Sequence, residues 1–199
     1  MDSIGTFTLP WRAKRDYVLG ADMADAMLGA LAPRGALAEP SFSVHEMVRT
    51  HSAEMLVLGA DETAQLAEFP VRLRLRLDGE IRHFVLRPLA DADGPAEVDD
   101  HEAAVWARAE RVGKSIALGA PFPLSTLTTA VSLKKRLMLD LFPDRRGKWT
   151  FCRLDAAAPP PTACARIAVR FRQAIRNIHL SEVTFGDSPP ARMQFMVTE

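Results

Sequence analysis

The sequence predicts an α+β protein in which one unit of strands and a helix occurs twice. Three observations lead to this class. Apolar residues alternate with arginines from Val71 to Leu77, which is typical of a strand with one apolar and one charged face. Periodicity predicts the order strand, helix and four strands on both sides of an acidic segment. Short segments also recur at offsets close to half of the 199 residues.

In the first half, apolar periodicity and turn residues place five strands around one helix. We expect strands at 4–9, 41–49, 54–58, 71–77 and 80–88 and a helix at 22–31. Asp22 is of a residue type that caps helices. Gly29 costs a helix about 1 kcal/mol relative to alanine, which predicts close packing on a sheet as its reason. Asp78-Gly79 predicts a tight hairpin turn with positive φ.

The acidic segment 90–100 contains Pro and Gly and is expected to link the halves. A helix should then run from Asp99 or Asp100 to about Gly113, and a longer one from Ser125 or Thr126 to Leu141. The buried positions expected on these helices are Ala103, Trp106, Ala107 and Val112, then Leu127, Val131, Met138 and Leu141. Strands are expected at 115–118, 148–154, 164–173, 175–185 and 192–198. The expected domains are 1–89 and 114–199, connected by 90–113.

Residue matches support an internal duplication. Val-Arg-Leu-Arg begins at residue 71 and Val-Arg-Phe-Arg at residue 169, 98 positions apart. Leu-Gly-Ala occurs at 19 and at 118, 99 positions apart, in both halves before the expected central helix. Trp11 and Trp106, 95 positions apart, each open a basic segment. Similar offsets for three matches favour two diverged copies of one unit.

Composition excludes several classes of protein. Lys+Arg and Asp+Glu number 25 each, so no net charge attracts the chain to nucleic acid or to an anionic membrane. No apolar run reaches the roughly 18 residues of a membrane-spanning helix, and no secretory signal opens the chain. The two cysteines, Cys152 and Cys164, make no disulfide framework and are expected to be small buried apolar groups. We therefore expect a soluble, cytoplasmic protein.

A strand, a long central helix and four further strands resemble the hot-dog fold, in which an antiparallel sheet wraps around one helix. Two such units resemble the double hot-dog proteins, which implies a tandem hot-dog fold over nearly the whole chain. The resemblance implies processing of an acyl thioester on coenzyme A or acyl-carrier protein, as a thioesterase or dehydratase, and allows a homodimer. The superfamily's Asp-Asn-Pro pattern with a nearby His and its His-Gly-Gly start are missing, which leaves open a non-catalytic ligand-binding or assembly module.

The candidate catalytic residues are Asp25, His45 and Asp22. A carboxylate at the start of a core helix can act as a general base if burial raises its pKa, although capping is the favoured explanation for Asp22. His45 titrates near neutrality and is the expected neighbour of Asp25 on a facing strand. His45 and His51 would lie about 20 Å apart on one strand at 3.3 Å per residue, too far for one metal ion. We therefore expect no metal and no cofactor.

Arginines form the candidate carrier-binding surface. Those singled out are Arg72, Arg74 and Arg76 on one strand and Arg170 and Arg172 on its counterpart. Lys134-Lys135-Arg136 and Arg145-Arg146 add two more basic clusters. These side chains form either the solvated face of each sheet or a dock for the phosphates of coenzyme A or an acidic carrier protein. Nucleic acid is not an expected partner, because aromatic residues make up only 7% of the chain.

Overall fold

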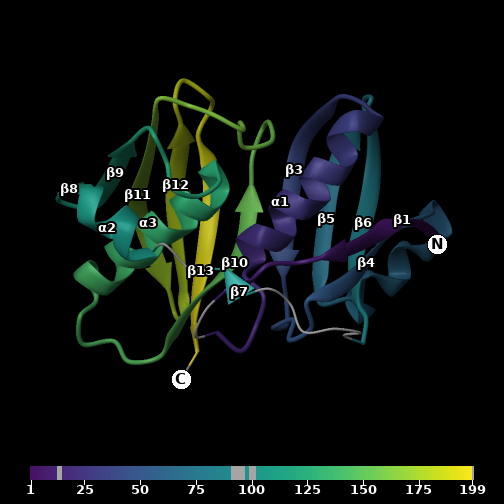
Figure 1. Cartoon of the computed structure of the whole chain (residues 1–199), viewed down its shortest axis with the longest axis horizontal. Coiled ribbons are helices and arrows are strands. Elements are labelled where there is room, and N and C mark those ends of the chain that lie inside the picture. Colours follow the sequence, from purple (N-terminus) through teal and green to yellow (C-terminus); the bar gives the residue numbers. More distant parts are fainter. Residues whose placement is uncertain (13–14, 91–96, 99–101, 199) are drawn as a thin grey trace. The chain divides into compact units, whose positions relative to one another are not determined.

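The computed structural model, shown in Figure 1, describes residues 1–12, 15–90, 97–98 and 102–198. The chain divides into two compact units, unit 1 (Met1–Asp100) and unit 2 (His101–Glu199). Each unit contains an antiparallel sheet and a few helices, so the predicted α+β class is confirmed. The expected linker at 90–100 and the expected helix start at Asp99 or Asp100 lie almost wholly outside the described residues.

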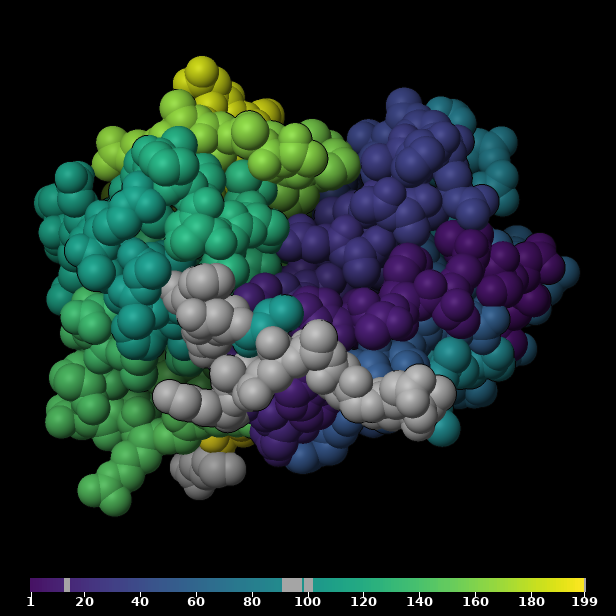
Figure 2. Space-filling model, viewed as in Figure 1, coloured from purple at the N-terminus to yellow at the C-terminus, as the bar shows by residue number. Residues whose placement is uncertain are grey.

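Unit 1 begins with a strand and a helix, as predicted. Its elements are β1 (Asp2–Thr8), β2 (Trp11–Arg12), α1 (Gly20–Leu31), η1 (Ala32–Arg34), β3 (Leu37–Val44), β4 (Ser52–Leu58), η2 (Ala60–Glu68), β5 (Val71–Leu77), β6 (Glu80–Pro88) and β7 (Glu97–Val98). Its sheet has the order β1-β4-β6-β5-β3, and β2 pairs with β7 in a separate parallel ladder. β1 is an edge strand, and the N-terminal residues lie at the surface in the space-filling view (Figure 2, purple).

Helix α1 packs its apolar side against the sheet of unit 1 (Figure 1). Its buried apolar side chains include Met23, Met27, Leu28 and Leu31. Leu19 is the N-cap residue and offers no side-chain cap, so the prediction that Asp22 caps this helix is wrong. Gly29 is exposed, and a Cβ added there would meet nothing within 4 Å. Close packing therefore does not explain this glycine.

The hairpin of β5 and β6 confirms the clearest sequence prediction. The apolar residues Val71, Leu73 and Leu75 are buried, whereas the alternating arginines are half-buried. Asp78 and Gly79 connect the strands with φ values of 51° and 84°, the positive values that a two-residue turn of this kind requires.

Strand β3 ends earlier than predicted, at residue 44 rather than 49. The reason is its partner, because β3 pairs with β5 and Val44 lies opposite Val71, the first residue of that strand. Beyond this pair the chain leaves the sheet, and the His45 N–H donates a hydrogen bond to the Pro70 carbonyl.

Unit 2 repeats the order of a strand, a long helix and four strands. Its elements are α2 (Glu102–Arg108), β8 (Glu110–Val112), β9 (Ser115–Gly119), α3 (Thr126–Leu141), β10 (Lys148–Asp155), β11 (Arg166–Ile175), β12 (Ile178–Phe185) and β13 (Ala191–Thr198). The sheet has the order β8-β9-β11-β12-β13-β10 and is antiparallel throughout. Helix α3 lies against it (Figure 1) and begins as predicted, with the Ser125 hydroxyl accepting a hydrogen bond of 3.0 Å from the Thr128 N–H.

The helix expected to reach Gly113 is shorter. It ends at Arg108, and the next residues form the strand β8 and a turn in which Gly113 has a φ of 57°. Val105 is the buried residue of α2, whereas Ala103 and Ala107 are exposed and Val112 is 80% exposed. The buried side was therefore predicted wrongly, because helical spacing was carried into a strand.

The two units share the order of elements but not the order of strands. In unit 2, a two-residue turn at Arg176 and Asn177 places β12 directly beside β11. In unit 1, β4 and β5 both pair antiparallel with β6 and therefore run parallel to each other. Parallel strands cannot be joined by a tight turn, and η2 provides the longer connection between them.

The matched segments of the two halves do not occupy equivalent elements. Val71 is in the third strand after α1, whereas Val169 is in the second strand after α3. Trp11 lies in β2 and Trp106 in α2. Duplication consequently remains a proposal that rests on the shared order of elements. Among the described residues, no helix is both long enough and apolar enough to cross a membrane.

Candidate functional site

The predicted acidic site at the start of α1 contains a buried ion pair. Arg12, in β2, donates from Nε to Asp22 Oδ2 at 2.8 Å and from Nη2 to Asp22 Oδ1 at 2.7 Å. Both side chains are buried, at 9% and 5% exposure. A two-bond contact of this kind holds both groups in one geometry and joins the strand to the helix. Asp22 thus has a structural partner that sequence spacing did not reveal.

Asp25 and His45, the other two predicted catalytic residues, have different surroundings. Asp25 is half-buried in the second turn of α1. His45 is exposed just after β3, with its Nε2 3.0 Å from the Ser43 hydroxyl. Asp25 is therefore less sequestered than Asp22, and His45 is open to solvent. His51 is buried, and no group of three or more metal-binding side chains occurs among the described residues.

The arginines predicted to bind a carrier are largely engaged within unit 1. Arg72 donates from Nε to the Phe69 carbonyl at 3.1 Å. Arg76 donates to Glu39 and to the Gly79 carbonyl, both at 3.0 Å. Arg74 lies opposite His83, and burial together with the Arg74 charge lowers the pKa of His83. These contacts leave no row of free guanidinium groups on β5.

The counterpart arginines of unit 2 differ from each other. Arg172 forms an ion pair with Glu182, and its Nε lies 3.0 Å from the carboxylate. Arg170 is exposed and makes no hydrogen bond or ion pair within the described part of the chain. Only Arg170 of this predicted pair therefore remains available to a ligand.

Lys134 is fully buried, contrary to its expected place in a basic surface cluster. From the middle of α3 its Nζ donates to the carbonyl oxygens of His179, at 2.8 Å, and of Met193. The same Nζ lies 4.8 Å from the centre of the Phe195 ring. Burial lowers the pKa of the Lys134 amine well below its usual 10.5, whereas the thiol of Cys152 nearby acts in the opposite direction.

The imidazole of His179 lies next to this amine in the core of unit 2. Its ring centre is 4.8 Å from that of Phe142 and 4.7 Å from that of Trp149. Burial, with Arg145 and Lys134 close by, lowers the pKa of His179 to about 4 from 6.5. Arg145 can only donate, so His179 Nε2 accepts at 3.1 Å and the ring proton is on Nδ1, which has no partner among the described residues.

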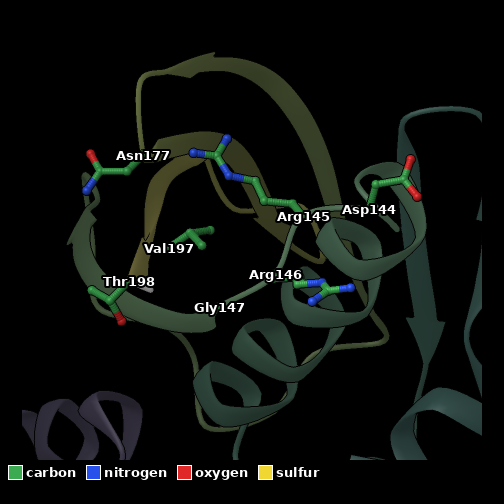
Figure 3. Close-up of a pocket in the computed structure, with 7 residues that line it drawn as sticks. All are labelled: Asp144, Arg145, Arg146, Gly147, Asn177, Val197 and Thr198. Atoms are coloured by element: carbon green, nitrogen blue, oxygen red, sulfur yellow. The ribbon is translucent and has the colours of Figure 1, made fainter.

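A pocket of about 920 Å³ is lined by Arg145, the residue that contacts this histidine (Figure 3). Its lining combines the loop after α3, the β11–β12 turn and the end of β13, and comprises Asp144, Arg145, Arg146, Gly147, Asn177, Val197 and Thr198. In Figure 3 the Arg145 side chain extends toward Asn177, and Arg146 and Asp144 lie on the other side.

Sequence reasoning missed Lys134 and His179, although both leave a signal. The predicted apolar positions Leu127, Val131, Met138 and Leu141 leave one gap in a repeat of four and three residues, and Lys134 fills it. His179 occupies an inward position of β12, which alternates with the buried Ser181 and Val183. A polar residue in an apolar pattern is informative because burying it needs a partner. The pocket itself had no such signal.

Comparison with known proteins shows similarity in structure alone. Neither a protein-family model nor a curated protein matches the sequence. A monomeric dehydratase domain from a trans-AT polyketide synthase split module is similar over 100% of both chains, with a TM-score of 0.54 and 10% identity. The dehydratase domain of RzxB from Pseudomonas fluorescens matches over 90% of this chain and 86% of its own, with a TM-score of 0.52 and 12% identity.

A thioesterase-type structure shows the same degree of similarity. The tesB protein of Mycobacterium avium subspecies paratuberculosis covers 96% of this chain and 91% of its own, with a TM-score of 0.52 and 11% identity. At such identities the likeness concerns the fold. The chain therefore has a hot-dog fold, as its order of elements led us to expect.

Proposed function

We propose that this protein binds an acyl thioester, carried on coenzyme A or on an acyl-carrier protein, and processes it in a thioesterase-like or dehydratase-like reaction. The observation that carries the proposal is the similarity in fold, over nearly the whole chain, to structures described as dehydratase domains and as a tesB protein. Fold alone does not select a reaction, so the choice between these chemistries depends on the site.

The proposed site is at the start of α1, and Asp25 is its general base. Asp22 is tied to Arg12 by two hydrogen bonds, whereas Asp25 is half-buried one turn further along the helix. In hydrolysis Asp25 would take a proton from water, the hydroxide would attack the thioester carbonyl, and the thiolate would leave and be protonated. In dehydration it would remove a proton from the carbon next to that carbonyl, and the hydroxyl group on the following carbon would take a proton from the second acid–base group and leave as water. His45 is the proposed second acid–base group.

Replacing the proposed base tests this assignment. A positioned base typically contributes 10²- to 10⁴-fold, so Asp25→Asn should lower turnover of an active acyl thioester by about that factor. Asp61→Asn is the matched control, because Asp61 is an exposed carboxylate of the same unit. Thermal unfolding of both variants shows whether the fold is kept. Parent turnover in a folded Asp25→Asn protein would contradict the assignment.

A non-catalytic ligand-binding module is the second candidate. The engagement of Asp22 by Arg12 favours it, because a carboxylate fixed in a buried ion pair is poorly placed to exchange protons with a substrate. Calorimetric titration with a non-hydrolysable acyl-CoA, together with hydrolysis and dehydration assays, separates the two. Binding without turnover supports the module, and turnover excludes it.

A further inference from the structure

Arg145 and Arg146 belong to the arginines that form no ion pair with an acidic residue in the part of the chain that the structure describes. Other guanidinium groups are paired with carboxylates, as in Arg12–Asp22, Arg76–Glu39, Arg87–Glu54, Arg153–Asp155 and Arg172–Glu182. Within the described ranges, no carboxylate lies within ion-pair distance of Arg145 or Arg146. Two uncompensated positive charges therefore line one pocket.

Arg145 is also held in place. Its Nη1 contacts His179 Nε2 and its Nη2 donates to the Arg176 carbonyl, both at 3.1 Å. Both partners are neutral at neutral pH, so they orient the guanidinium without cancelling its charge. Because its geometry is fixed beforehand, less side-chain entropy is lost when a ligand binds. Arg146 is exposed and can turn toward the same ligand.

We infer that the pocket lined by Arg145 and Arg146 is a binding site for the phosphate or pyrophosphate group of a small ligand. A planar guanidinium donates two parallel hydrogen bonds to phosphate oxygens. The Asn177 amide and the Thr198 hydroxyl line the same pocket and offer uncharged donors. Its volume of about 920 Å³ leaves room for more than the phosphates, which suits a nucleotide-like ligand. Among the described residues of the lining, Asp144 is the acidic one, and its charge weakens the site.

This site does not depend on the proposed acyl chemistry. Coenzyme A carries phosphate groups of this kind, and inorganic pyrophosphate carries them alone. Pyrophosphate therefore probes the site itself, and coenzyme A probes its link to the proposed function. If the protein binds pyrophosphate here but turns over no thioester, the phosphate site is supported and only the proposed function is contradicted.

Calorimetric titration with inorganic pyrophosphate provides the test. Arg146→Gln should weaken binding about tenfold, the loss of one charged contact of about 1.4 kcal/mol. Arg166→Gln is the control, because it removes one exposed arginine of the same unit that lies at the other end of β11 from the pocket, and it should change the affinity less than twofold. Asp144→Asn should strengthen binding about threefold, an effect that local unfolding cannot imitate. Affinity should also fall as salt concentration rises.

Three results would overturn the inference. These are an absence of pyrophosphate binding to the parent protein at millimolar concentration, equal losses in Arg146→Gln and Arg166→Gln, and an unchanged or weaker affinity in Asp144→Asn. Coenzyme A that binds and is weakened by Arg146→Gln supports the site as its phosphate dock. Coenzyme A that fails to bind while pyrophosphate binds supports the site and assigns it to another phosphate-bearing ligand.

Discussion

Arg12 and Asp22 show how one contact can change the interpretation of a residue. At the start of a helix an aspartate is typical of a cap, and among apolar neighbours it is typical of a buried base. In this protein Asp22 is instead half of an ion pair, because Arg12 in β2 donates two hydrogen bonds to its carboxylate. A buried charge whose partner is removed is left without compensation, so each residue of the pair depends on the other.

Asp22→Ala should therefore lower the free energy of unfolding by about 3–5 kcal/mol, the range for breaking a buried ion pair. Urea denaturation measures the loss. Glu182→Ala is the control, because its ion pair with Arg172 is partly exposed, at 31% and 42%, and should contribute less than about 1 kcal/mol. The double variant Arg12→Met/Asp22→Leu should lose less than Asp22→Ala, since it leaves no unpaired charge. Equal losses in Asp22→Ala and Glu182→Ala would show that burial does not strengthen this pair.

At the scale of the element, α1 contains a glycine that its packing does not require. Gly29 is in the helix interior, exposed, with open space where a Cβ would lie. The β5–β6 hairpin, in contrast, contains a glycine that its backbone requires. Gly79 has a φ of 84°, a value that residues with a side chain rarely adopt. The same substitution should thus have opposite effects at the two positions.

Gly29→Ala should raise the free energy of unfolding by about 1 kcal/mol, the difference in helix propensity. Gly79→Ala should lower it by about 1 kcal/mol, because alanine is strained at positive φ. Chemical denaturation of both variants measures the two shifts. A destabilised Gly29→Ala protein would mean that the outer side of α1 is covered by a partner.

Two substitutions in β5 test which of its side chains face the core. Leu75 is fully buried and Arg74 half-buried. Leu75→Ala should lower the free energy of unfolding by about 2–5 kcal/mol through lost apolar contacts and a cavity. Arg74→Ala should cost less than about 1 kcal/mol. Thermal or urea unfolding compares the two, and a larger loss for Arg74→Ala would contradict the assigned facing.

At the scale of the molecule, buried polar side chains concentrate in unit 2. Those of unit 1 are Arg12, Asp22 and His51, whereas unit 2 buries Thr126, Thr128, Thr129, Ser132, Lys134, His179 and Ser181. The bases Lys134 and His179 both have pKa values lowered by burial, so the core of unit 2 favours their neutral forms. Protonation therefore acts against the folded state of unit 2.

The pH dependence of stability follows from His179. Its pKa is about 4 in the folded state and 6.5 when exposed. Between these values the unfolded chain takes up a proton that the folded chain does not, so stability falls as pH falls from about 6.5 to about 4. The loss should reach up to about 3 kcal/mol. Urea denaturation across this range measures it, and His179→Phe, which keeps an aromatic ring but has no titrating group, should flatten the profile. An identical profile in that variant would assign the effect to other groups.

The sequence alone determined features that depend on neighbours along the chain. Alternation from Val71 to Leu77 specified both the strand and its buried face, and Asp78-Gly79 specified the turn. Ser125 marked the start of α3. The repeated order of elements resembled the hot-dog fold, and the similarity to solved structures supports that fold. The strand, the turn and the helix start are each set within a few residues, because strand period, turn geometry and helix capping are local properties.

Only the tertiary structure decided which residues meet across the fold. The partner of Asp22 lies in another element, and the carbonyls that accept from Lys134 come from β12 and β13. The pocket of Arg145 and Arg146 likewise assembles from a loop, a turn and a strand end. The strand order of unit 1, in which β6 separates β4 from β5, is also a matter of pairing. The spacing of apolar residues predicts which positions face the core. The role of a buried charged or hydrogen-bonding group depends on its partner, which comes from a segment distant in the sequence.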